Sequence, residues 1–167
     1  MAFDAALNLA MKHRDDLGYP WVEPDTGTLE LAAANATGTA ILVSAKATAA
    51  MSAVPTRVTT AKASMAKLDE IADAVTRLNA QGVPDAGLIY RTEPDQRDDL
   101  IVITVSSLSE TLMTALASKF GTSLIAVRVR PLDDWVASSN SRASDAPACC
   151  CLEIPAAAYI RNGQTER

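Results

Sequence analysis

Leu100-Ile-Val-Ile-Thr-Val105 and the two segments that follow it decide the predicted fold. The run itself is rich in β-branched residues, which favour a strand. The pattern Ser107-Leu-Ser-Glu110 then predicts the start of a helix, because the serine hydroxyl and the glutamate carboxylate can satisfy each other's exposed amides. This helix is expected to end at Gly121 and to bury Leu108, Leu112, Met113, Leu116 and Phe120.

A closing strand follows in Ser123-Leu-Ile-Ala-Val-Arg-Val-Arg130. Its alternation places one set of side chains on each face of a sheet. The apolar face holds Ile125, Val127 and Val129, and the other face holds Arg128 and Arg130. Upstream, residues 87–93 predict a strand that pairs with 100–105 as a hairpin across the polar connection 94–99.

The first half of the chain predicts the same order of elements. Two short strands between residues 19 and 31 flank the turn Pro24-Asp-Thr-Gly27, and residues 55–61 predict a closing strand. The intervening segment, 39–53, is ambiguous, since Ile41-Leu-Val43 favours a strand but its alanine-rich continuation favours a helix. We take the helix as the prediction.

Two sequence matches at nearly equal spacing indicate an internal repeat. Glu23-Pro-Asp25 opens the first hairpin turn, and Glu93-Pro-Asp95 is expected to open the second, 70 residues later. Arg57-Val58 on the first closing strand matches Arg128-Val129 on the second at a spacing of 71. Both halves are therefore predicted to run strand, turn, strand, helix, strand.

The remaining segments complete an α+β architecture. Residues 3–17 predict an amphipathic helix, and a second helix is expected between an N-cap at Ser64 and a stop at Gly82. The predicted fold is two β-hairpin–α–β units, each a three-stranded antiparallel-type sheet with helices on one face. The expected domains are 1–63 with the N-terminal helix and first unit, 64–131 with the linking helix and second unit, and 132–167 as an irregular tail.

Composition excludes several classes of function. The chain has 167 residues, a net charge of −5 and 49% hydrophobic residues, so we expect a globular protein that does not bind nucleic acid. No apolar run is long enough to span a membrane, and Asp4 and Lys12 interrupt any signal-peptide core. The expected location is the cytoplasm, unless a leader has been removed.

Cys149, Cys150 and Cys151 are adjacent, which is unsuited to a disulfide framework or a zinc site.

The sequence shows no active site or cofactor motif. His13 is the single histidine and lies between Lys12 and Arg14, so a surface role is expected rather than that of a catalytic base. There is no Gly-x-Ser-x-Gly elbow and no phosphate-binding glycine loop. Adjacent carboxylates such as Asp69 and Glu70 are expected to diverge. We therefore predict a non-enzyme without a cofactor or metal.

Three segments resemble the pro-regions of actinobacterial chymotrypsin-like serine proteases, of the streptogrisin and α-lytic protease type. They are Trp21–Leu31, the stretch from Arg57-Val58 to Leu68-Asp69, and the hairpin that ends in Leu100–Val105. Leu116–Gly121 and Ala126–Pro131 fit as well. The resemblance covers about residues 18–131. The sequence contains no protease domain, so it looks like an orphan pro-region or a truncated gene product.

The resemblance implies a folding chaperone and inhibitor of a serine protease, and secretion if a leader is missing. In such pro-regions the last strand pairs with the protease and the tail enters its substrate cleft. The implied partner-binding residues here are Ile125, Val127, Arg128, Val129, Arg130, Leu132 and Trp135. A vestigial protease remnant is one alternative. Another is a repeated α+β module for dimerisation or small-ligand binding.

Overall fold

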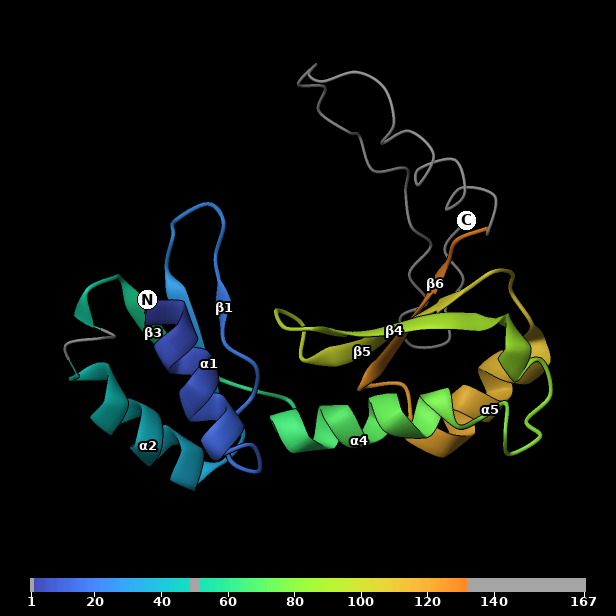
Figure 1. Ribbon diagram of the computed structural model, residues 1–167, viewed down its shortest axis with the longest axis horizontal. Coiled ribbons are helices and arrows are strands. Elements are labelled where there is room, and N and C mark those ends of the chain that lie inside the picture. The colour runs from blue at the N-terminus through green and yellow to red at the C-terminus, as the bar shows by residue number, and fades with distance from the viewer. Residues whose placement is uncertain (1, 49–51, 132–167) are drawn as a thin grey trace, which may run out of the picture. The chain divides into compact units, whose positions relative to one another are not determined.

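The computed structural model describes residues 2–48 and 52–131 of the chain (Figure 1). Contacts divide the chain into two compact units. The first contains the described residues up to Val75 together with Glu93–Ile101, and the second contains Thr76–Thr92 together with the described residues from Val102 on. The predicted α+β class is confirmed, because four helices accompany two three-stranded sheets in these residues. None of these helices is long and apolar enough to cross a membrane.

The first sheet has the order β1-β2-β3 and is mixed. β1 (Trp21–Val22) and β2 (Leu29–Ala33) form the predicted antiparallel hairpin. β3 (Thr56–Thr60) pairs with β2 in parallel, with Leu29 opposite Thr56 and Ala33 opposite Thr60. The predicted antiparallel-type sheet is therefore mixed instead. The reason is that a helix connects β2 to β3, and such a crossover returns the chain in the same direction.

Two helices cover one face of this sheet. They are α1 (Ala2–Lys12) and α2 (Ala36–Lys46). Their buried residues join those of β2 in one core, formed by Ala6, Ala10, Leu17, Leu29, Leu31, Ala33, Leu42 and Met65. The ambiguous segment is thus helical up to Lys46, as predicted, although α2 starts and ends earlier than expected and residues 49–51 lie outside the described residues. Its N-cap is Asn35, whose side chain accepts a 2.9 Å hydrogen bond from the backbone N–H of Gly38.

The next helix, α4 (Met65–Thr76), begins where the sequence predicted. The hydroxyl of Ser64 accepts a hydrogen bond from the backbone N–H of Lys67, so Ser64 is the predicted cap. One stripe of the helix is buried, at Met65, Leu68, Ile71 and Val75. Turns then carry the chain to Gly82, where a positive φ of 71° suits glycine.

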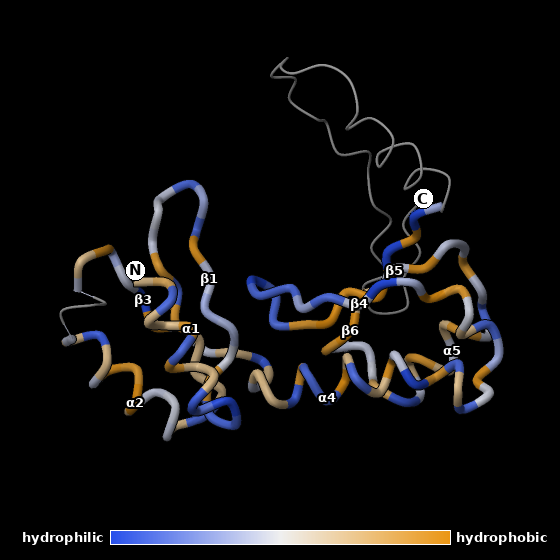
Figure 2. The backbone as a smooth tube through the Cα atoms, in the orientation of Figure 1, coloured by the Kyte–Doolittle hydropathy of each residue, from blue (hydrophilic) through white to orange (hydrophobic). Residues whose placement is uncertain are grey.

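The second sheet has the order β4-β5-β6. The 3₁₀ turn η1 (Ala86–Leu88) leads into β4 (Ile89–Asp95), and β5 (Leu100–Val105) has the predicted bounds. β5 is the hydrophobic centre of the sheet (Figure 2), with residues 101–105 all buried. Helix α5 (Glu110–Phe120) follows, and β6 (Ile125–Val129) closes the unit. The hairpin–helix–strand order therefore occurs twice, as predicted.

Two details of the predicted second half are wrong. The cap of α5 is Ser109, whose hydroxyl accepts from the N–H of Leu112 at 3.2 Å, rather than Ser107. Leu108 consequently precedes the helix and is 59% exposed instead of buried. The hairpin turn also starts later than expected, since Glu93-Pro-Asp95 lies inside β4. Proline is tolerated there because β4 is an edge strand.

The repeat is clearest in the two helices that follow the hairpins, α2 and α5. α2 and α5 each have 11 residues, and each is capped by the side chain that precedes it, Asn35 or Ser109. The seventh residue of each helix is a buried leucine, Leu42 or Leu116. The sequence matches at Arg57-Val58 and Arg128-Val129 do not share this register, because they fall at different places in β3 and β6.

Candidate functional site

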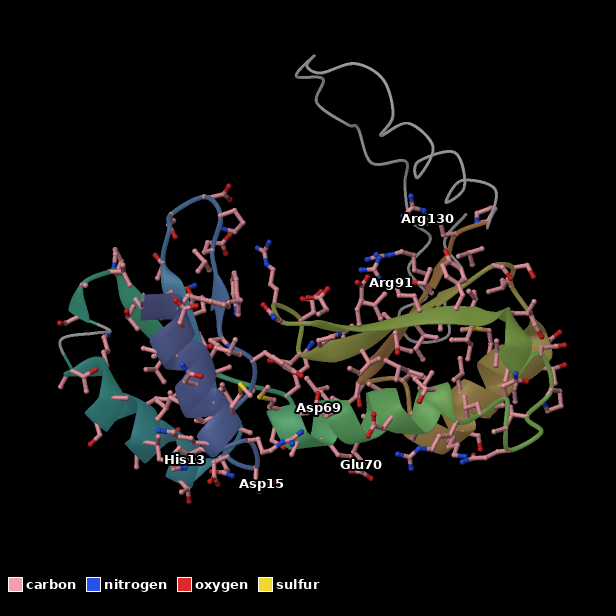
Figure 3. The ribbon with its side chains drawn as sticks, in the orientation of Figure 1. His13, Asp15, Asp69, Glu70, Arg91 and Arg130 are labelled. Atoms are coloured by element: carbon pink, nitrogen blue, oxygen red, sulfur yellow. The ribbon has the colours of Figure 1, made fainter. Side chains whose placement is uncertain are left out.

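The predicted partner-binding strand, β6, lies at an edge of the second sheet. On the apolar face of this strand, Val127 is buried at 8% exposure, whereas Val129 near its end is 43% exposed. Ile125 and Arg128 are half-buried, and Arg130 just beyond the strand is exposed (Figure 3). Leu132 and Trp135, the two remaining predicted contacts, lie outside the described residues.

The backbone of β6 shows which residues face the open edge. The N–H of Arg130 donates to the carbonyl of Val105 on β5 at 2.9 Å. The carbonyl of Arg130 accepts from the hydroxyl of Tyr90 at 3.0 Å. Because successive residues of a strand direct their N–H and C=O groups to opposite sides, those of Val127 and Val129 point away from β5. An added strand would therefore pair with these two residues.

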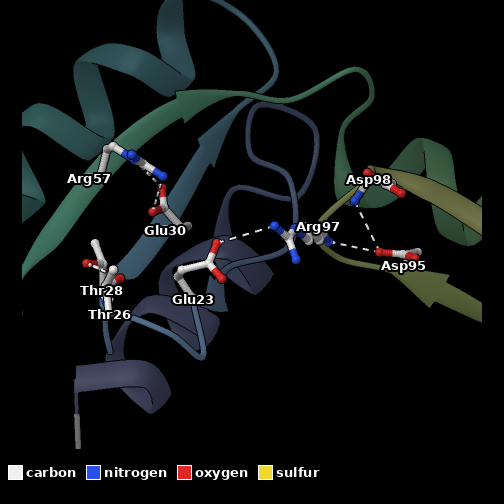
Figure 4. Close-up of polar contacts among 8 residues, drawn as sticks. All are labelled: Glu23, Thr26, Thr28, Glu30, Arg57, Asp95, Arg97 and Asp98. Carbon is white, nitrogen blue, oxygen red and sulfur yellow. Dashed lines mark hydrogen bonds and ion pairs between the residues drawn. The ribbon is translucent and has the colours of Figure 1, made fainter. Parts of the chain in front are cut away.

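An ion pair between a buried glutamate and an exposed arginine joins two strands of the first sheet (Figure 4). Glu30 is fully buried, and Arg57 stands opposite it in the β2–β3 register. The Nε of Arg57 donates to Oε2 of Glu30 at 2.9 Å, and its Nη2 lies 2.7 Å from Oε1. This hydrogen bond, and then the charge of Glu30, raise the pKa of Arg57. The pair gives the buried carboxylate a cationic partner, because an unpaired charge at this position would be strongly unfavourable.

A second carboxylate of the same hairpin, that of Glu23, lies farther from its cationic partner, Arg97. Glu23 precedes the first turn, and its side chain is 13% exposed. The Nη2 of Arg97 lies 3.7 Å from its Oε2, while its Oε1 has no hydrogen-bond partner among the described residues. The same guanidinium is 5.6 Å from the centre of the Trp21 ring, within range of a cation–π contact. The side chain of Arg97 therefore contacts both Glu23 and Trp21, which lie at the β1 edge of the first sheet.

Asp99 is a buried acid at the tip of the β4–β5 hairpin, in the first unit. The residue is 7% exposed and has a φ of 51°. Its Oδ2 accepts from the backbone N–H of Lys62 at 3.2 Å. Burial raises the pKa of Asp99; the Lys62 hydrogen bond and charge lower it, and the charges of Asp98 and Asp95 add smaller increases. The net direction is upward.

Replacing Asp99 by asparagine is expected to stabilise the protein more at pH 7 than at pH 3.5. The folded state holds the proton of Asp99 more tightly than the unfolded chain, whose value is about 3.8. The contribution of Asp99 is therefore fully present below that value and is lost as pH rises through the folded pKa. Asparagine retains the acceptor for Lys62 and tolerates the positive φ.

Urea unfolding of the wild type and the Asp99→Asn variant at both pH values measures this difference. Asp98→Asn removes one negative charge from the neighbouring residue and is the matched control. An equal change in unfolding free energy at the two pH values would show that Asp99 does not titrate differently in the folded state.

Other polar residues hold the first unit together. The hydroxyl of Tyr19 donates to Oδ1 of Asp69 at 2.5 Å, and Arg14 pairs with Oδ2 of the same carboxylate. Burial, and then the hydrogen bond to Asp69, raise the pKa of Tyr19. The adjacent Glu70 pairs with Lys67 instead. The two neighbouring carboxylates, Asp69 and Glu70, therefore diverge as predicted (Figure 3).

No metal-binding group of side chains is found in the parts of the chain that the structure describes. Residues 2–48 and 52–131 contain no group of three or more His, Cys, Asp or Glu side chains that could hold a metal ion. His13 is half-buried at the end of α1 (Figure 3). Cys149, Cys150 and Cys151 lie outside the described residues. The chain matches no protein-family model, and no curated protein is detectably similar to it in sequence.

Sequence reasoning missed one surface feature. A shallow groove lies between α2 and β3, lined by Val43, Lys46, Ala47, Thr56, Arg57 and Val58. The helical residues among them are spaced three and four apart, which places them on one face. This spacing was visible in the sequence. Its pairing with β3 was not, because only the parallel crossover brings the end of α2 beside that strand.

Proposed function

We propose that the chain is a non-catalytic, pro-region-like protein that acts as folding chaperone and inhibitor of a chymotrypsin-like serine protease domain. The proposal combines the resemblance of residues 18–131 to such pro-regions with the edge position of β6. In this function β6 adds to a sheet of the protease as an extra strand. Backbone hydrogen bonds then supply the affinity with little demand on sequence.

The outward-facing backbone of Val127 and Val129 carries the proposal. Their N–H and C=O groups point away from β5, and no hydrogen bond to them is found within the described residues. The exposed side chain of Val129 lies at the same edge. An edge strand with free donors and acceptors is the element that strand addition requires. Arg128 and Arg130 flank these residues with positive charge, which disfavours pairing of this edge with the same edge of a second copy.

Val129→Pro is expected to weaken protease inhibition at least about tenfold, because it removes one outward donor and leaves a partner carbonyl unpaired. Proline is compatible with an edge strand when its nitrogen faces away from the sheet. The measurement is the inhibition constant of the full chain against chymotrypsin and α-lytic protease, with a chromogenic substrate. Recovery of active enzyme from denatured protease measures the chaperone activity in parallel.

Val129→Thr is the matched control, since it changes the side chain and keeps the backbone N–H. It should inhibit within about twofold of the wild type. Circular dichroism of both variants checks that the sheet is retained. The proposal is wrong if the wild-type chain inhibits neither protease and assists the refolding of neither. It is also wrong if Val129→Pro inhibits as well as Val129→Thr.

A further inference from the structure

The groove between α2 and β3 runs along an open strand edge. Three consecutive residues of β3, Thr56 to Val58, line it. Consecutive strand residues point to opposite faces, so a groove that touches all three must follow the edge of the strand rather than one face of the sheet. β3 is an outer strand of the first sheet, so that edge has no neighbouring strand among residues 2–48 and 52–131.

The hydrogen bonds of β3 show which backbone groups face this groove. The carbonyl of Pro55 accepts from the N–H of Leu29, and the N–H of Ala61 donates to the carbonyl of Ala33, both at 2.8 Å. In a parallel ladder the odd-numbered residues between them therefore pair with β2. Val58 and Thr60 direct their backbone groups outward, and neither has a further hydrogen bond in the described residues.

The side chains around this edge combine an apolar surface with positive charge. Val43 on α2 is 63% exposed, and it faces the groove together with Ala47 and Val58. Lys46 makes no ion pair among the described residues, and Arg57 is 64% exposed although Glu30 holds it. Glu30 engages Nε and Nη2 of Arg57, so further N–H groups of its guanidinium stay available to an acceptor.

We propose that this groove binds an extended peptide that pairs with β3 through its backbone and directs a carboxylate at Lys46 and Arg57. The free donors and acceptors of Val58 and Thr60 fit an added strand. Val43 and Ala47 offer an apolar contact for every second side chain of the peptide. Lys46 and Arg57 complement an acidic group on it. The site lies in the first unit and is separate from the β6 edge, so it goes beyond the proposed function.

A second copy of the chain is a poorer occupant of the groove. Two copies related by a two-fold axis present the same patch to each other. Lys46 and Arg57 of one copy would then approach those of the other, and like charges at an interface are unfavourable. An acidic peptide avoids this repulsion, because its carboxylate pairs with Lys46 and is a second acceptor for Arg57 beside Glu30.

The test uses two synthetic octapeptides of alternating threonine and valine, one ending in two glutamates and the other in two glutamines. Each is titrated into the ¹⁵N-labelled full chain. The acidic peptide is expected to shift the amide signals of Val58 and Thr60 and to bind about fivefold more tightly than the neutral one. Lys46→Glu should lose about fivefold in affinity for the acidic peptide. Lys12→Glu, which makes the same charge change in the last turn of α1, should lose none.

Thr60→Pro, which removes an outward N–H, should weaken binding, whereas Thr60→Val should not. Val129→Pro should bind the peptide like the wild type, which keeps this test independent of the protease proposal. The inference is overturned if the amide signals of β3 do not shift or if both peptides bind with equal affinity. It is also overturned if Lys46→Glu and Lys12→Glu bind the acidic peptide with the same affinity. Self-association that Thr60→Pro abolishes would also overturn it, because the occupant would then be a second copy.

Discussion

Gly38→Ala is expected to destabilise the protein by about 3 kcal/mol, because the new methyl group has no room. Gly38 lies in the first turn of α2 and is buried. A Cβ at this position would stand 2.1 Å from the carbonyl oxygen of Asp16 and 3.1 Å from Cδ2 of Leu17. The first of these contacts is with backbone, so a side-chain rotation cannot relieve it.

Neither chain segment at this contact can move away without losing hydrogen bonds. The carbonyl of Asp16 accepts from the N–H of Ala34 at 2.8 Å, and the carbonyl of Leu17 accepts from Met65 at 2.7 Å. On the other side, the N–H of Gly38 donates to the Asn35 cap. Relief of the overlap therefore breaks either a cap or a backbone bond, which adds to the cost of the strain.

Chemical unfolding of Gly38→Ala measures the effect, with Gly87→Ala as the control. A Cβ at Gly87 meets no atom within 4 Å, so its replacement should change the unfolding free energy by less than about 0.5 kcal/mol. A Gly38→Ala variant as stable as Gly87→Ala would mean that α2 does not pack against the Asp16 backbone.

Leu42→Ala and Leu116→Ala are each expected to cost about 3 kcal/mol of stability. The two leucines are 2% and 1% exposed and occupy the same place in their 11-residue helices. Leu42 belongs to the core shared with β2, and Leu116 lies on the buried side of α5. Truncation of either side chain removes buried apolar contacts and leaves a cavity that the surrounding residues fill only partly.

Thermal and urea unfolding of the two single variants test this equivalence. Leu108→Ala removes the same atoms from a residue that is 59% exposed, so it should cost less than about 0.5 kcal/mol. If one helix variant unfolded like the wild type while the other lost stability, the two repeats would not share a core position, contrary to the structural match.

The order of elements could be predicted from the sequence because local signals agree with tertiary packing in most segments. β5 has the predicted bounds, since its β-branched run fits a central strand that is covered on both faces. Ser64 caps α4 as expected. Ser107 failed as a cap because Ser109 offers a competing hydroxyl, which also bonds Asp85. A motif alone cannot decide between two serines when a distant residue stabilises one of them.

The polar interior of the first sheet could not be predicted in the same way. Glu30 alternates with Leu29 and Leu31, which places its side chain on the opposite face of the sheet and suggests exposure. It is fully buried instead, because Arg57 arrives on the parallel strand opposite it. The partner of Glu23, Arg97, comes from a segment far along the chain. Such pairs depend on which strands become neighbours, and a single sequence does not specify that.

Pro94 in β4 limits how far strands can add to the second sheet. A sheet with two competent edges can accept a strand on each side, and repeated addition of that kind leads to open-ended fibres. Proline has no N–H to offer, and prolines on edge strands are one of the ways in which sheets avoid edge-to-edge pairing. We therefore expect growth to end at this edge. A partner that adds a strand at β6 would form a closed complex of one chain with one partner, rather than a polymer.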